Sequence, residues 1–165
     1  MSSVKLAVDE LIAPLASAKT LRARAEELKE IRLKWLEEPL WPPENFDGLA
    51  ELRRSRGIPI AAGENVYTLL DFKRLLDAKA VDFVQPSVAK MGGVSEMRTV
   101  FPLAAVHNIA VMPHSFYDGP GLLAAIHLTA ACGTVDSMIE WRRFDVEAPR
   151  SPRRPAGLLC LRVRA

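Results

Sequence analysis

The chain has 165 residues, of which 49% are hydrophobic and 25% are charged, a composition typical of globular proteins and not of disordered or fibrous ones. Its 22 Lys and Arg against 20 Asp and Glu give a net charge of +2, which argues against a dedicated nucleic-acid or membrane-surface binder. Two cysteines are too few for a disulfide framework, and no stretch reaches the roughly 18 apolar residues of a membrane span, so we expect a cytoplasmic protein.

Short apolar runs alternate with longer segments of helical pattern along the chain. The runs begin near residues 4, 32, 58, 81, 109 and 135, so successive starts differ by 28, 26, 23, 28 and 26 residues. One strand and one helix together have about this length, and their alternation predicts about six βα units around a parallel sheet. The helices between the runs are predicted over residues 17–29, 46–54, 68–78, 95–107 and 121–131.

Six such units suit either a doubly wound sheet or a partial TIM (β/α)8-type barrel, since a whole barrel takes about 250 residues. The pattern alone does not choose between them. It stops near residue 148, and residues 149–165 hold three Pro and five Arg, which predicts an irregular tail outside the domain of residues 1–148. A binding role for this basic tail is a minor alternative, because no aromatic residues are interleaved with its arginines.

Acidic residues follow three of the predicted strands where each strand ends. They are Asp9, Glu37 and Glu64, separated by 37 − 9 = 28 and 64 − 37 = 27 residues, which is one βα unit each. In a barrel these ends lie on one face, so the three carboxylates would repel one another and at least one would take up a proton unless a cation were present. An all-carboxylate ligand set is one that Mg²⁺ prefers. The alternative is that each acid is a solvated loop residue.

Two further predicted strand ends carry groups suited to proton transfer. Lys90 follows the fourth run just before a glycine pair, and His114 follows the fifth. Both are expected to face the same metal, although an isolated lysine or histidine is more often a surface or structural residue. His107 and His127 lie inside predicted helices and are interpreted as structural.

Four motifs in this order resemble the mandelate racemase and muconate lactonizing enzyme branch of the enolase superfamily. They are WLEEP at residues 35–39, AAGEN at 61–65, QPSVAKMGG at 85–93 and MPHS at 112–115. The resemblance covers residues 4–141 and implies a C-terminal barrel domain of about six βα units. It also implies that the N-terminal α+β capping domain and the first two barrel strands of the family are lacking here.

The resemblance implies a role for each matching residue. Asp9, Glu37 and Glu64 would bind Mg²⁺, and Glu38 would lie behind them. Lys90 would be a general base or an electrostatic partner of the substrate, His114 the histidine of the seventh strand, and Glu140 an acid that binds the substrate carboxylate.

Two matching positions depart from the family pattern. Ser87 occupies the position of an aspartate that normally holds the histidine, so we expect His114 to lack an orienting carboxylate. Leu11 replaces the asparagine that usually follows the first metal ligand, which removes a polar neighbour of Asp9.

By this resemblance the function is Mg²⁺-dependent removal of the proton α to a carboxylate, most simply in the dehydration of a sugar acid or hydroxy acid. Racemisation, epimerisation and cycloisomerisation are the alternatives within the family. A different hypothesis is a non-catalytic remnant that keeps only the metal site. The expected partner is a small-molecule carboxylate, not nucleic acid or membrane, and exposed barrel edges predict self-association or a homo-oligomer.

Overall fold

Four short parallel strands form the centre of the protein. The structure is a computed structural model that describes residues 33–56, 58–117, 119–135, 137–142 and 158–162. The strands are β1 (Leu36–Glu37), β2 (Ile60–Ala62), β3 (Phe83–Val84) and β4 (Ala110–Val111), and they pair in the order β1-β2-β3-β4. Because the order in the sheet follows the order in the chain without reversal, the arrangement is that of a barrel segment and not of a doubly wound sheet.

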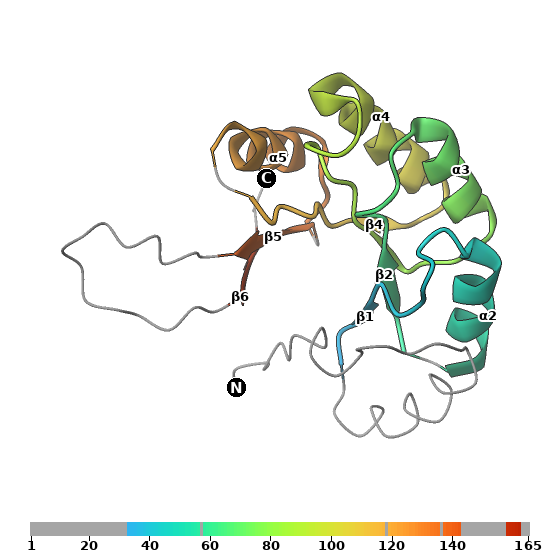
Figure 1. Ribbon diagram of the computed structural model, residues 1–165. Helices are drawn as coiled ribbons and strands as arrows, with labels where there is room; N and C mark the ends of the chain where they lie inside the picture. The colour runs from blue at the N-terminus through green and yellow to red at the C-terminus, as the bar shows by residue number, and fades with distance from the viewer. Residues whose placement is uncertain (1–32, 57, 118, 136, 143–157, 163–165) are drawn as a thin grey trace.

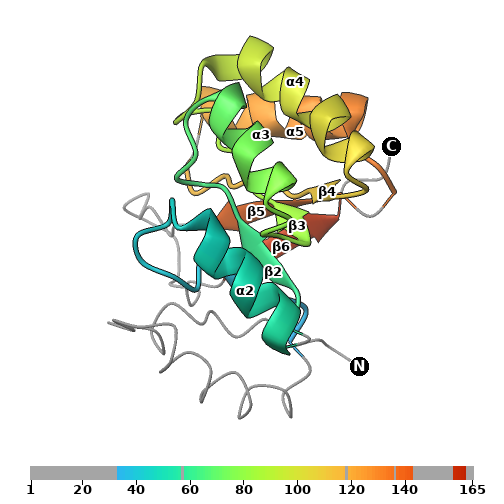
Figure 2. The ribbon, with the colours of Figure 1, turned by 90° about the vertical axis from the view of Figure 1, so that its right-hand side faces the viewer.

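A helix follows each of these strands on the outer side of the sheet. The helices form an arc around the strands in Figure 1, and Figure 2 shows α3, α4 and α5 side by side. Their bounds are α2 (Phe46–Arg56), α3 (Leu69–Asp77), α4 (Gly93–Val106) and α5 (Pro120–Cys132). The four helices predicted for this part of the chain are confirmed to within two residues at each end. The predicted helix over 17–29 and the first predicted strand lie outside the described residues.

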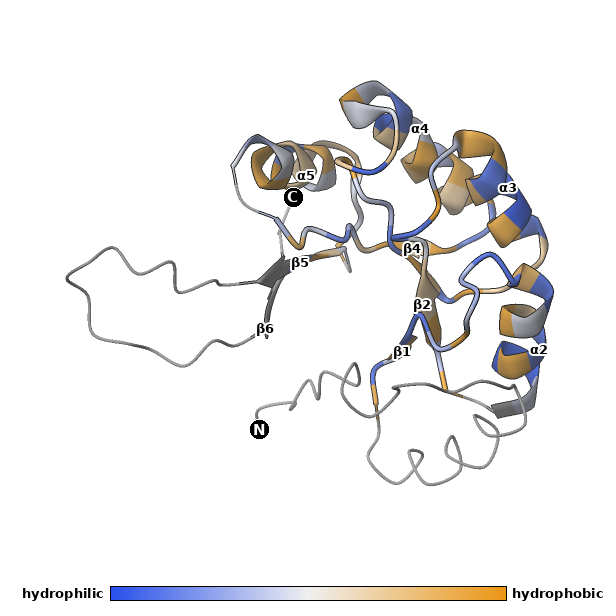
Figure 3. Ribbon diagram, in the orientation of Figure 1, coloured by the Kyte–Doolittle hydropathy of each residue, from blue (hydrophilic) through white to orange (hydrophobic). Residues whose placement is uncertain are grey.

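Helix α3 shows how the sequence specifies these elements. Thr68 caps its N-terminus, where the side-chain oxygen accepts a hydrogen bond from the Asp71 amide at 3.2 Å. Spacing of apolar residues by three and four then places Phe72, Leu75 and Leu76 on one buried face. Figure 3 shows the hydrophilic residues of α3 on the side away from the strands. The core of the molecule therefore lies between the helices and the sheet.

The last described strands form a separate antiparallel pair, β5 (Met138–Arg142) with β6 (Leu158–Arg162). The Glu140 amide donates to the Pro113 carbonyl at 3.1 Å, so β5 runs beside the segment that follows β4. The expectation of an irregular tail over residues 149–165 is therefore wrong for Leu158–Arg162. The average composition of that segment concealed a short apolar run, LLCL, that pairs with β5.

Within the described parts of the chain, every helix is too short or too polar to cross a membrane.

Candidate active site at the carboxyl ends of the strands

Five of the residues singled out in the sequence lie at the ends of consecutive strands. Glu37 is the last residue of β1, Glu64 follows β2, Lys90 lies in the loop after β3, His114 follows β4, and Glu140 lies in β5. Because parallel strands end at the same edge of the sheet, their side chains converge there. Asp9, the sixth candidate, lies outside the described residues.

His114 is held between two carboxylates. Its Nδ1 atom lies 2.9 Å from Glu64 Oε2 and 2.5 Å from Glu140 Oε2, and the side chains of His114 and Glu140 are each only 9% exposed. Burial by itself would lower the pKa of the imidazole, but the contacts with Glu140 and Glu64 outweigh it and raise the pKa to about 9. The ring is therefore charged near neutral pH and acts as the cation between the two acids.

Glu64 also contacts Lys90. Its Oε1 atom accepts a hydrogen bond from Lys90 Nζ at 3.1 Å, and the same amine donates to the side-chain oxygen of Asn65 at 3.2 Å. Burial would raise the pKa of the Glu64 carboxyl, but His114 and Lys90 more than compensate and lower it to about 2. Lys90, Glu64, His114 and Glu140 thus form one continuous chain of ionic contacts.

Glu37 completes the group from the β1 side. One ligand atom each from Glu37, His114 and Glu140 lie within 4.8 Å of one another, close enough to share a metal ion. The indole Nε1 of Trp35 donates to Glu37 Oε2 at 3.1 Å and orients that carboxylate. Sequence reasoning missed this contact, although Trp35 is part of the WLEEP motif.

Glu38 lies behind this group, and its carboxyl has a raised pKa. Its Oε1 atom accepts a hydrogen bond from the Gly63 amide at 2.8 Å, whereas its Oε2 atom is buried without a hydrogen-bond partner among the described residues. Burial, with a further contribution from the negative charges of Glu64 and Glu37, raises the pKa of the Glu38 carboxyl to about 7. Proton uptake was expected at Asp9, Glu37 or Glu64, but the pKa of Glu64 is lowered and the raised pKa belongs to the neighbouring Glu38.

These donors fit a hard divalent cation such as Mg²⁺. Several carboxylates converge on one edge, and burial together with the charges of Glu64 and Glu37 raises the pKa of the Glu38 carboxyl. The Glu140 Oε2 and His114 Nδ1 atoms are buried at ion-pair distance but do not align as a hydrogen bond. A cation placed among the carboxylates would satisfy oxygens that one imidazole proton cannot serve at once.

Among the described residues, no hydrogen bond joins Ser87 to the His114 ring, but the ring does have carboxylate partners. Glu64 and Glu140 supply them, so the expectation of a histidine without an orienting carboxylate is wrong. The Ser87 hydroxyl donates instead to the Tyr117 hydroxyl at 3.3 Å, and Tyr117 donates to the His114 carbonyl at 3.1 Å. No sequence motif indicated Tyr117, which follows MPHS by two residues.

Comparison with known proteins shows which proteins this chain is similar to. A family model described as Enolase C-terminal domain-like matches residues 2–153. The D-xylonate dehydratase of Haloferax volcanii is 38% identical over 115 residues, which are 70% of this chain and 27% of that protein. The D-galactarolactone cycloisomerase of Agrobacterium fabrum is 35% identical over 99 residues, which are 60% of this chain and 26% of that protein. The chain thus spans about a quarter of the length of these relatives.

Solved structures show the same relationship. A mandelate racemase/muconate lactonizing enzyme-like protein from Rubrobacter xylanophilus superimposes with a TM-score of 0.71 and 43% identity, covering 76% of this chain and 31% of that one. A mandelate racemase/muconate lactonizing protein from Paracoccus denitrificans, complexed with magnesium, gives a TM-score of 0.64 and 31% identity over 68% of this chain and 30% of that one. The fold is therefore an α/β parallel sheet that matches part of the barrel of these proteins.

Proposed function

This chain belongs to the Enolase C-terminal domain-like family, and from that premise we propose that its site removes the proton α to a carboxylate in a Mg²⁺-dependent reaction. The substrate we propose is a sugar acid or hydroxy acid, and the outcome we propose is loss of water. The observation that carries the proposal is the convergence of Glu37, Glu64 and Glu140 around His114, with Lys90 attached to Glu64.

We assign the metal to Glu37 and Glu64, with Asp9 as the third ligand. Carboxylate oxygens are the ligands that Mg²⁺ prefers over imidazole nitrogen, which leaves His114 free for proton transfer. When bound, Mg²⁺ would supply positive charge that stabilises the enediolate formed as the α-proton leaves. The related Paracoccus denitrificans protein, which is complexed with magnesium, supports Mg²⁺ as the metal.

Lys90 and His114 are suited to the two proton transfers of a dehydration. One group accepts the proton from the α-carbon, and the other gives a proton to the hydroxyl on the β-carbon, which departs as water. His114 suits the donor role because two carboxylates hold a proton on its ring. Lys90 lies on the other side of Glu64 and would accept the α-proton as the neutral amine, after its ammonium group has given up a proton. Glu140 is placed to hold His114, in addition to the substrate contact that the resemblance implies.

A cycloisomerase is the second candidate. It uses the same enediolate but joins or opens a ring in place of releasing water, and the Agrobacterium fabrum relative carries that name. Dehydration is preferred because two of the relatives are dehydratases of simple sugar acids, D-xylonate and D-galactonate.

The proposal is tested by incubating the full chain with Mg²⁺ and a panel of aldonic and aldaric acids, with detection of 2-keto-3-deoxy products. We expect turnover that Lys90→Met and His114→Asn each reduce by at least about a hundredfold, since each removes a proton-transfer group. Ring-opened or lactone products in place of keto acids would favour the cycloisomerase. Mg²⁺ binding without any turnover would reject the catalytic proposal and favour the remnant.

A further inference from the structure

Both main-chain polar groups of His114 are anchored to the loop that follows β3. The His114 amide donates directly to the Pro86 carbonyl at 3.1 Å. The His114 carbonyl accepts a hydrogen bond from the Tyr117 hydroxyl, which in turn accepts one from the Ser87 hydroxyl. The backbone of His114 is therefore linked to this loop by two sets of hydrogen bonds, directly to Pro86 and through Tyr117 to Ser87. These links are independent of the contacts of its ring.

The same loop determines where Lys90 lies. Ser87 is fully buried, and its carbonyl accepts hydrogen bonds from the amides of Lys90 at 3.1 Å and Met91 at 3.0 Å. Ser87 thus holds the turn of Lys90 with its backbone and the loop of His114 with its side chain. The two proton-transfer groups share this one residue as a common support.

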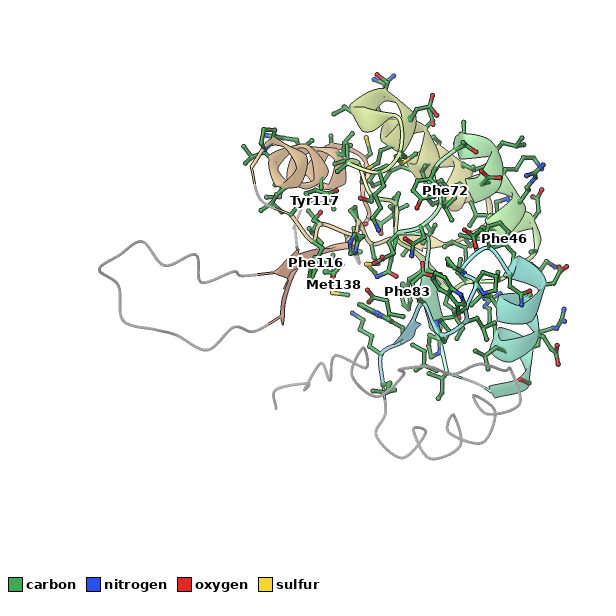
Figure 4. The ribbon with its side chains drawn as sticks, in the orientation of Figure 1. Phe46, Phe72, Phe83, Phe116, Tyr117 and Met138 are labelled. Carbon is green, nitrogen blue, oxygen red and sulfur yellow. The ribbon has the colours of Figure 1, made fainter. Side chains whose placement is uncertain are left out.

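Helix α5 leaves room for the Tyr117 ring that makes this link. A Cβ atom at Gly121, in the first turn of α5, would lie 2.7 Å from Tyr117 Cε2 and 2.8 Å from Cδ2. Glycine at this position therefore allows the ring to lie against the helix, and Figure 4 shows Tyr117 beneath α5. The ring is confined by the helix at its edge and by two hydrogen bonds at its hydroxyl.

We propose that Tyr117, oriented by Ser87, is a positioning residue that fixes the placement of His114 relative to Lys90. The importance of this spacing for catalysis rests on the proposed function, because proton acceptor and donor must both reach one substrate. The anchoring itself is a property of the chain without substrate or metal. It gives buried Ser87 a role other than a contact with the imidazole.

The test uses the full chain labelled with ¹⁵N-histidine. The chain contains three histidines, His107, His114 and His127. Ring signals are recorded without metal or substrate. In Tyr117→Phe we expect the His114 ring signals to broaden about twofold or more, or to split, because its carbonyl loses its side-chain partner and the loop gains alternative positions. The His107 and His127 signals should stay unchanged and report that the fold is intact.

Tyr67→Phe is the matched control, because Tyr67 is the other tyrosine of the chain and is 54% exposed. It should leave all three histidines as they are. Unchanged His114 signals in Tyr117→Phe would overturn the proposal. If Tyr117→Phe fails to fold, Ser87→Ala is the test. It removes only the hydroxyl that donates to Tyr117 and should broaden the same His114 signals. An unchanged His114 ring in Ser87→Ala would then overturn the proposal.

Turnover separates this proposal from the proposed function. In an active protein, Tyr117→Phe should lower kcat roughly tenfold and change KM less than about twofold, because binding is kept while alignment is lost. An equal loss of kcat in Tyr117→Phe, in Ser87→Ala and in the Tyr67→Phe control would contradict a positioning role. If the wild type turns over no sugar acid while the His114 signals respond as expected, the anchoring stands and the proposed function falls.

Discussion

The Glu38 carboxyl accepts a hydrogen bond from the Gly63 amide, but its negative charge is unfavourable in its buried position. Glu38 Oε1 accepts the Gly63 amide, while burial and two neighbouring acids raise the pKa of the carboxyl from 4.5 to about 7. The folded protein therefore binds more protons at this group than the unfolded chain between those two values. Its contribution makes the folded state less stable as pH rises through this window, by about 3 kcal/mol in total.

We expect Glu38→Gln to reduce this loss of stability, because the amide keeps an oxygen for Gly63 but carries no charge. Urea unfolding of metal-free protein at pH 5 and pH 8 measures the effect. Glu38→Ala is the matched variant. It should be less stable than Glu38→Gln at both pH values, by about 1–3 kcal/mol, since the Gly63 amide loses its acceptor. Equal pH dependence in the wild type and Glu38→Gln would show that the Glu38 charge is not the cause.

The pKa of His114 gives a second prediction at this scale. A histidine whose pKa is raised to about 9 in the folded protein stabilises it fully below its usual value of 6.5, and this stability is lost as pH rises through 9. Glu140→Gln removes one of the two carboxylates, so we expect the pKa of His114 to fall by about one unit. NMR titration of metal-free protein measures it, with His107 and His127 in the same spectra as references. An unchanged pKa would mean that Glu64 alone holds the proton.

At the scale of elements, the turn after β2 depends on Gly63. Its φ is +130°, and a Cβ atom there would lie 3.1 Å from the Gln85 amide nitrogen and 3.1 Å from Phe72 Cε1. We expect Gly63→Ala to lower the free energy of unfolding by about 1–3 kcal/mol, from backbone strain and crowding together. It should also displace Glu64, the next residue, from His114.

Gly93→Ala is the control for Gly63→Ala, because Gly93 also has a positive φ of +80° but a Cβ atom there would meet nothing within 4 Å. Urea denaturation of the two variants should therefore show the larger loss at Gly63. If the two losses were equal, crowding against Gln85 and Phe72 would not contribute.

Helix α3 offers a test that does not involve the site. Thr68→Ala removes the oxygen that caps the Asp71 amide and should cost about 1 kcal/mol of stability. Thr68→Ser keeps that oxygen and should retain most of the stability in the same thermal unfolding measurement. A loss in Thr68→Ser as large as in Thr68→Ala would show that the methyl group, and not the cap, is what matters.

At the scale of the whole molecule, the periodicity of the sequence predicted the helices and the parallel strands well. Apolar spacing and capping are local properties, as the Thr68 cap and the buried face of α3 show. The positions of Glu37, Glu64, Lys90 and His114 at predicted strand ends also indicated that these residues lie on the same edge of the sheet. Strand β6 was not predicted, because its own segment is dominated by Arg and Pro.

The contacts within the site were less predictable than its location. Which side chains converge depends on how the strands twist relative to one another, so the approach of Glu140 to His114 required the folded structure. Ser87 was recognised as a departure from the family pattern, but its hydrogen bond to Tyr117 depends on a ring that lies against Gly121. The ligand role of Asp9 stays a prediction.

The central claim is that Glu37 and Glu64 hold one divalent ion, and calorimetric titration of Mg²⁺ tests it most directly. The full chain, Glu64→Gln and a control, Glu51→Gln on the exposed side of α2, are titrated under the same conditions. We predict one saturable site in the wild type and in Glu51→Gln, with affinity at least about tenfold weaker in Glu64→Gln. Equal heats from all three proteins, or no heat from any of them, would contradict the claim.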